Sequence, residues 1–263
     1  MPSIATRTFS TKFWRDQSIL RPIVTRLPWR KLSTAVQPQQ ESSNAASRNH
    51  EGLVNPLAHP DFFRVHSLFT IEELFDAKVH LGHKIGSLDD HMRPFIFGSR
   101  LGHLIIDLDQ TAALLRQALN FAAHVAFRDG VILFVSKNSQ INHIVETTAK
   151  ECREFAHTRR WKLGTFTNAF YEFGAVTRLP DLCIFINTME SVVKEHIAVA
   201  HAAKMAIPTI GIVDTNCNPN LITYPVPGND DTPCAVELYC RLFKEAIIRG
   251  KSSRELLLSM KTE

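Results

Sequence analysis

Residues 131–135 read VILFV, and this run of five apolar side chains decides the fold class. Two similar runs follow it, LCIFI at residues 182–186 and PTIGIV at residues 208–213. Short, continuous apolar runs rich in β-branched residues are typical of strands that are buried on both faces. Together the three runs predict a mainly parallel sheet.

Amphipathic segments separate these runs. Apolar side chains recur at helical spacing over residues 109–128, 138–155 and 188–206, which predicts one helix in each segment. Strands that alternate with helices form a sheet whose two faces are both covered. We therefore predict an α/β fold, doubly wound, with a mainly parallel sheet flanked by helices in a flavodoxin-like or Rossmann-like arrangement.

Shorter signals lie on either side of this pattern. Thr70 and Glu73 in TIEELF have the spacing of a helix cap, which predicts a helix over residues 70–78. PFIF and HLIID, separated by the turn-prone GSRLG, predict two short strands. A last apolar pattern begins behind YPVPGNDDT (residues 224–232) and predicts a C-terminal helix.

Charge divides the chain. Residues 1–40 contain seven Lys or Arg and one acid, Asp16, which leaves 23 basic and 25 acidic residues in the rest. A basic, Ser/Thr-rich and almost acid-free leader is typical of a mitochondrial transit peptide, and a basic RNA-binding arm is the alternative. We predict an extended tail over residues 41–69, the α/β domain over residues 70–250 and a C-terminal tail over residues 251–263. We expect a protein of the mitochondrial matrix with no membrane span.

Polar residues follow the predicted strands, where an α/β enzyme would place its active site. They are Asp107, Ser136, Lys137, Asn187, Asp214, Thr215 and Asn216. The sequence has neither a GxGxxG motif behind a strand nor a P-loop, and polar side chains at strand ends also cap helices. We predict no catalytic residue, no cofactor and no small-molecule substrate, with a nucleotide-dependent enzyme as the alternative.

Histidines and aspartates gather in one stretch of the sequence and suggest a metal site. They are His80, His83, His91, His103, Asp89 and Asp90. The HExxH spacing that places two imidazoles on one helix face is absent, and Gly82 interrupts the first pair of histidines. We predict no metal ligand, with a metal-dependent enzyme as the alternative.

Two adjacent carboxylates, Asp230 and Asp231, lie directly ahead of the last predicted helix. Acids at a helix N-terminus are favoured by capping and by the helix dipole. We predict a helix-capping or structural role for both, and for Asp214 behind the strand at residues 208–213. An ion pair between these acids and an arginine of a neighbour is a second open role. Acid–base catalysis would need a substrate cleft that the sequence does not indicate.

Seven segments occur in order along the chain, among them RPFIFGSRLGHLIIDLDQT, RRWKLGTFTN, IPTIGIVDTNCNP and YPVPGNDD. The set resembles the ribosomal protein two family of the small subunit, in its mitochondrial form, over about residues 70–250. The resemblance implies a non-enzymatic constituent of the mitochondrial small ribosomal subunit that binds rRNA and neighbouring ribosomal proteins near the junction of head and body. Bacterial members insert a long helical hairpin where this chain has only AFYEFGAVTRLPD, so the hairpin is expected to be missing.

The segment RRWKLGTFTN (residues 159–168) is the main candidate RNA contact. Arg159, Arg160 and Lys162 place three cations around an indole ring. That ring belongs to Trp161, and Asn168 adds a hydrogen-bonding side chain. Because cations bind phosphates and aromatic rings stack on bases, we predict that all five residues contact RNA. The alternative is a solvated basic loop with Trp161 anchored in the core.

Lys84, Arg93 and Arg100 form a second candidate RNA-binding patch. Bacterial members of the family carry a basic and aromatic segment behind VHLGHK, and Asp89 and Asp90 replace it here. A domain of nearly neutral charge is expected to dock largely through protein faces.

Overall fold

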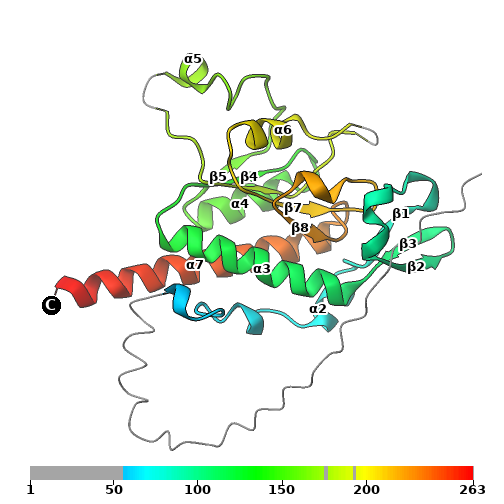
Figure 1. Ribbon diagram of the computed structural model, residues 1–263, viewed down its shortest axis with the longest axis horizontal. Helices are drawn as coiled ribbons and strands as arrows, with labels where there is room; N and C mark the ends of the chain where they lie inside the picture. Colours follow the sequence, from blue (N-terminus) through cyan, green and yellow to red (C-terminus); the bar gives the residue numbers. More distant parts are fainter. Residues whose placement is uncertain (1–55, 175–176, 192–193, 263) are drawn as a thin grey trace, which may run out of the picture. The chain divides into compact units, whose positions relative to one another are not determined.

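The computed structural model describes residues 56–174, 177–191 and 194–262 (Figure 1). A five-stranded parallel sheet in the order β5-β4-β6-β7-β8 organises them. Its strands are β4 (Ile132–Val135), β5 (Phe155–His157), β6 (Leu182–Phe185), β7 (Thr209–Val213) and β8 (Tyr224–Pro227). The α/β class and the parallel sheet that the apolar runs predicted are confirmed.

A separate antiparallel sheet has three strands in the order β1-β3-β2. They are β1 (Leu81–Lys84), β2 (Ile96–Arg100) and β3 (His103–Ile106). Leu101 and Gly102 make the turn between β2 and β3 with φ angles of 51° and 80°. The segments PFIF and HLIID therefore form a hairpin, and β1 adds a third strand that the sequence did not indicate.

Six helices are described in these parts of the chain. They are α2 (Ile71–Asp76), α3 (Leu108–Phe127), α4 (Asn142–Glu151), α5 (Ala169–Phe173), α6 (Ile197–Lys204) and α7 (Pro233–Thr262). Short 3-10 helices lie at Pro56–Ala58, Val65–Ser67, Ile85–Ser87, Asp90–Phe95 and Pro219–Leu221. None of the helices within the described ranges is both long and apolar enough to cross a membrane.

Alternate residues of the parallel strands face two different cores. Phe134 and Ile184 point to the core shared with α3, α4 and α7, whereas Val135 and Phe185 point to the core shared with α6. Figure 1 shows the same division, with α3 and α7 on one side of the sheet and α6 on the other. Strands buried on both faces explain why their sequences are continuously apolar.

The edge strand β8 contains two prolines, Pro225 and Pro227. Gly228 donates its N–H to the carbonyl of Val213 in β7, so residues of even number on β8 donate toward β7. Residues of odd number face outward, and both of them lack an N–H. The β8 edge of the sheet therefore offers no strand N–H to another strand, which is a known way of protecting an edge.

Two predicted helices differ from the structure, and strand β8 was not predicted. The predicted helix over residues 138–155 is shorter, and Phe155 belongs to β5 rather than to the helix. The predicted helix over residues 188–206 begins only at Ile197, where the His196 side chain accepts the N–H of Ala198. Strand β8 lies within YPVPGNDDT, where no strand was predicted; its two prolines argue against a strand unless it lies at an edge.

The packed part of the chain extends beyond both predicted domain boundaries. Phe63 and Val65 are buried in the core although residues 41–69 were expected to be an extended tail. Arg249 fixes this segment by donating to the carbonyls of Phe63 and Arg64. Helix α7 continues to Thr262, past the predicted domain end at residue 250. The predicted transit peptide at residues 1–40 lies outside the described residues.

Candidate RNA interface

The segment that follows β5 is anchored to the protein by Trp161. This indole is only 7% exposed and packs edge-on against Phe166 with ring centroids 4.8 Å apart. Its Nε1 donates to Nδ1 of His201 on α6 at 3.1 Å, and burial lowers the pKa of His201, as suits a neutral acceptor. Trp161 is therefore buried as a core anchor, which is the alternative that the sequence left open and which leaves little of the ring exposed for stacking on RNA.

The cations on either side of this anchor point to solvent. Arg159, Arg160 and Lys162, hereafter the basic cluster, are all exposed. Within the described ranges, none of the three side chains has an ion-pair partner, whereas Arg93, Arg178 and Arg241, for example, each bind an acid. The fold thus holds three uncompensated charges on a firmly anchored loop.

Asn168 lies at the far end of the same loop and is also exposed. Its N–H donates to the carbonyl of Gly164 at 2.7 Å, and Gly164 has a φ of 93°, a conformation that favours glycine. The backbone of Asn168 accepts the first N–H groups of α5, from Tyr171 and Glu172. Its amide side chain makes no cap of α5, so it is exposed without that hydrogen bond.

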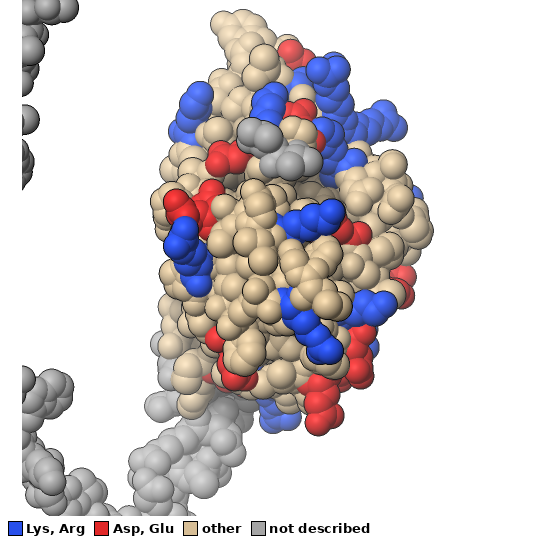
Figure 2. All heavy atoms as spheres, turned by 90° about the vertical axis from the view of Figure 1, so that its right-hand side faces the viewer, with Lys and Arg blue, Asp and Glu red and all other residues tan. Residues whose placement is uncertain are grey.

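The second predicted patch is only partly assembled. Lys84 on β1 and Arg100 on β2 are each paired in register with His103 on β3, so both lie at one end of the antiparallel sheet. Arg93 differs, because its guanidinium binds Asp90 at 2.8 Å. Figure 2 shows this end of the molecule, where blue and red side chains are interspersed.

Asp89 and Asp90 form local contacts. Asp89 accepts the N–H of His91 at 2.8 Å and begins the 3-10 helix Asp90–Phe95, while its own N–H donates to the carbonyl of Thr215. Asp90 neutralises Arg93. These acids therefore shape the loop behind β1, and they lower the net charge of the second patch.

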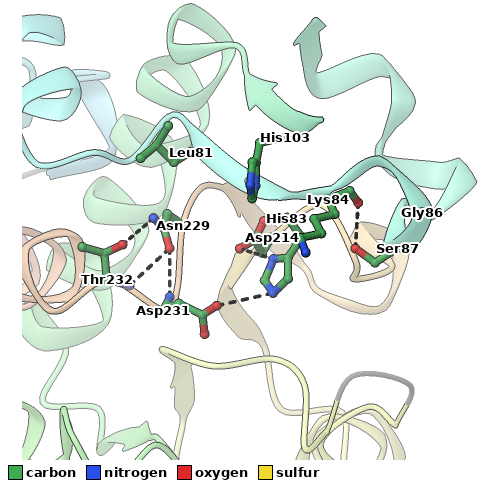
Figure 3. Close-up of a pocket in the computed structure, with 11 residues that line it drawn as sticks. Leu81, His83, Lys84, Gly86, Ser87, His103, Asp214, Asn229, Asp231 and Thr232 are labelled. Carbon is green, nitrogen blue, oxygen red and sulfur yellow. Dashed lines mark hydrogen bonds and ion pairs between the residues drawn. The ribbon is translucent and has the colours of Figure 1, made fainter. Parts of the chain in front are cut away.

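A third group of polar residues surrounds His83 (Figure 3). Its Nδ1 lies 2.9 Å from the buried carboxylate of Asp214, and its Nε2 lies 3.4 Å from Asp231. The hydrogen bond to Asp214 raises the pKa of His83 to about 9, so the ring is an imidazolium at neutral pH. One cation thus stands between two anions.

Glycine allows this contact. A Cβ atom at position 82 would lie 2.4 Å from Cγ2 of Thr215, so a larger residue would push β1 away from the end of β7. His83 also donates its backbone N–H to Oγ1 of Thr215 at 3.0 Å. Sequence reasoning weighed His83 against nearby histidines and missed Asp214, because the two are 131 residues apart in the chain.

His83, Asp214 and Asp231 are the described residues whose ligand atoms, within 4.8 Å of one another, could share a metal ion. They border a pocket of about 630 Å³ that Lys84, Ser87 and His103 also line. Both imidazole nitrogens already face carboxylates, so an ion would have to displace a proton held with a pKa of about 9. The arrangement is a closed ion-pair group in which the imidazolium supplies the positive charge.

Asp230 is buried beside this group and accepts hydrogen bonds from the amide of Asn187 at 3.2 Å. Burial, followed by repulsion from Asp214 and Asp231, raises its pKa well above the usual range of an aspartate. The Ser136 hydroxyl in turn donates to Asn187 Oδ1 at 3.1 Å. Polar side chains at the ends of the strands are therefore bound to one another within the protein.

Asn229 organises the turn that leads into α7. Its Oδ1 accepts the N–H groups of Asp231 and Thr232 at 3.0 and 3.2 Å, and its Nδ2 donates to the carbonyl of Lys78. No described N–H group of α7 donates to Asp230 or Asp231; Asp230 binds the amide of Asn187, and Asp231 faces His83. Like Asp214, both acids are paired with side chains of the protein itself.

The sequence analysis did not single out the aromatic side chains of α5, which are exposed. Phe170, Tyr171 and Phe173 are 62%, 81% and 63% exposed. The signal was the composition of AFYEF, with three aromatic residues in a helix too short to bury them. Only Ala169 of this helix is buried.

Comparisons with known proteins agree with the segments that the sequence singled out. The family model described as ribosomal protein S2 matches residues 74–171 and 169–250. The small ribosomal subunit protein uS2m of Bos taurus is 56% identical over 225 residues, which cover 86% of this chain and 77% of the bovine protein. The uS2 proteins of Rickettsia akari (strain Hartford) and Phenylobacterium zucineum (strain HLK1) are 34% and 35% identical, over 70% and 69% of this chain and 76% and 75% of their own lengths. The chain therefore belongs to the ribosomal protein S2 family, a family of structural ribosomal proteins and not of enzymes.

Proposed function

We propose that this chain is a structural constituent of the mitochondrial small ribosomal subunit, where it binds rRNA and neighbouring ribosomal proteins near the junction of head and body. The observation that carries the RNA contact is the basic cluster, three exposed cations without internal partners on a loop anchored by Trp161. Free cations on a rigid support are suited to phosphates, because no internal ion pair has to be broken on binding.

The location in mitochondria is supported by two features. The bovine relative, at 56% identity, carries the name of a small ribosomal subunit protein, uS2m. Residues 1–40 have the seven-to-one excess of basic over acidic residues that is typical of a transit peptide. Fusion of these residues to a fluorescent reporter tests the leader: we expect import, and a reporter that stays in the cytosol would contradict it.

The predicted winding of the fold is supported by the strand order. Numbering the parallel strands from β4 gives the order 2-1-3-4-5, which is the flavodoxin-like order. One face carries α3, α4 and α7, and the other carries α6 with packed loops. We infer a doubly wound fold in which one helical layer is reduced, with no room in AFYEFGAVTRLPD for the bacterial hairpin.

Sedimentation of the tagged protein on a sucrose gradient tests the proposal. We expect co-migration with the small ribosomal subunit in a mitochondrial lysate, together with release when the subunit is dissociated by high salt. A protein that stays at the top of the gradient under all conditions would contradict the structural role. Binding of neighbouring proteins is tested in the same fractions by chemical cross-linking, which should join exposed lysines of this chain to other small-subunit proteins.

A further inference from the structure

Helix α5 presents aromatic side chains to solvent instead of burying them. Phe170, Tyr171 and Phe173, hereafter the aromatic platform, have exposed fractions of 62%, 81% and 63%. Figure 1 shows α5 at the outer end of its loop, away from the parallel sheet. Large aromatic groups exposed together on a short helix cost free energy in water, which indicates that they are covered when the protein is assembled.

The loop that carries the aromatic platform is fixed at its base. Trp161 and Phe166 are buried beside α6, and Gly174 ends α5 with a φ of 94°. Phe170 and Tyr171 also contact each other edge-on, with ring centroids 5.4 Å apart. The rings are therefore displayed on a supported segment, which lowers the entropy lost on binding.

Charge decides what kind of partner this segment fits. From residue 158 to residue 174 the basic cluster is opposed by one acid, Glu172. An apolar protein partner that covered this segment would have to remove water from three uncompensated cations as well as from the rings, and it would gain nothing from the cations unless it brought acids. A single RNA strand supplies phosphates for the cations and flat bases for the rings along one chain.

We propose that the aromatic platform stacks on unpaired bases of an rRNA segment whose phosphates the basic cluster neutralises. This inference rests on the proposed function, and it adds the class of RNA, single-stranded rather than duplex. In this proposal the bases stack on Phe170, Tyr171 and Phe173, and not on Trp161, which is buried. Bases within a duplex are covered by their neighbours, so the platform contributes only where the RNA is unpaired.

The test compares the full-length protein with two triple variants in binding to a labelled RNA oligonucleotide of about 12 nucleotides. In the first variant, Phe170, Tyr171 and Phe173 are all replaced by Leu, which keeps apolar area and removes the aromatic faces. In the second they are all replaced by Ala, which removes both. Because the three residues are mostly exposed, the melting temperature of both variants is expected to equal that of the wild type.

We expect the Leu variant to bind single-stranded RNA on the order of tenfold more weakly for each stacked base that is lost. The slope of its affinity against salt should stay unchanged, because the phosphate contacts remain. Its affinity for a duplex of the same sequence should equal that of the wild type. Undiminished binding of single-stranded RNA by the Leu variant would overturn the proposal.

A protein partner gives a different result. If the Leu variant still associates with the small subunit and the Ala variant does not, the platform is bound by an apolar protein surface and the proposal is wrong. Association of the wild-type chain with the small subunit is measured separately. If the wild-type chain does not associate with the small subunit, the proposed function is refuted. If the wild-type chain associates and the Leu variant binds single-stranded RNA as tightly as the wild type, only the proposal about the aromatic platform is refuted.

Discussion

The loop from residue 158 to residue 174 and the polar group around His83 use similar side chains in opposite ways. Around His83, an imidazolium lies between two carboxylates, and the amide of Asn187 binds the buried Asp230. On the loop, the basic cluster and the aromatic platform have exposed side chains. The difference teaches that polar or aromatic character does not by itself mark a binding surface; a better sign is a group of such side chains that are exposed together on one segment and lack internal partners.

This contrast has an energetic basis. Buried polar groups are tolerated when hydrogen bonds and opposite charges replace water, and the group around His83 meets this condition. Removing one member of such a group is expected to lower the free energy of unfolding. Mutation of the exposed cations on the loop is expected to change the free energy of unfolding little, because these side chains make no internal ion pair. Stability measurements therefore separate the two regions before any ribosome is involved.

The largest effect on stability is expected at the anchor of the loop. Trp161→Ala should lower the free energy of unfolding by about 3 to 5 kcal/mol, because it leaves a cavity and removes the donor to His201. Arg160→Gln, one residue away and exposed, is the matched control and should change it by less than about 0.5 kcal/mol. Both values come from denaturant titration of the purified chain. Equal stability of Trp161→Ala and the control would show that the indole is not a core anchor.

A smaller effect is expected at the start of α7. Asn229→Ala should cost about 2 kcal/mol, because this buried side chain accepts the N–H groups of Asp231 and Thr232 in the turn before α7 and also donates to the carbonyl of Lys78. Asp231→Asn, which keeps the shape of an exposed side chain, should cost less than about 1 kcal/mol. Thermal unfolding of the two variants measures the difference. The reverse order of stabilities would show that Asp231, and not Asn229, holds the start of α7.

The pH dependence of stability tests the ion pairs of His83. Its pKa rises from 6.5 to about 9 on folding, so its contribution is fully present below pH 6.5 and is lost as pH rises through 9. We expect the wild type to lose about 1 kcal/mol relative to His83→Gln over this window, less than the shift implies because the ring is partly exposed. The raised pKa of Asp230 gives a decline of the same sign, so the comparison between the two proteins is what matters. Parallel pH profiles would show that His83 is not held as an imidazolium.

The sequence predicted those features that follow from local pattern. The apolar runs predicted β4, β6 and β7, and Thr70 caps α2 by accepting the N–H of Glu73 at 3.3 Å. Strand β5 was missed because Phe155 continues the apolar pattern of the helix predicted over residues 138–155, and β8 was missed because its two prolines argue against a strand. The ion pair between His83 and Asp214 could not be seen, since only the tertiary fold brings these residues together.

In the candidate RNA-binding segment, the sequence indicated which types of side chain are present but not which of them face solvent. The cations of RRWKLGTFTN are exposed as expected, whereas Trp161 in the same segment is buried. Which side of a loop faces the core depends on neighbouring elements, here α6 and its His201. The aromatic residues of α5 were passed over because they were counted only as part of a short connection.

The salt dependence of association with the small subunit tests the central claim most directly. All three residues of the basic cluster are replaced by Gln, and a control variant carries Gln at three exposed cations elsewhere, Arg128, Lys150 and Lys204. Neither variant should change the free energy of unfolding by more than about 0.5 kcal/mol. Co-sedimentation is then measured across a salt series. We expect the slope of log affinity against log salt to shrink by about 0.7 to 0.9 for each lost phosphate contact in the basic-cluster variant, with the control unchanged. A salt profile of the basic-cluster variant identical to that of the wild type would contradict the claim and would move the RNA contact to Lys84 and Arg100.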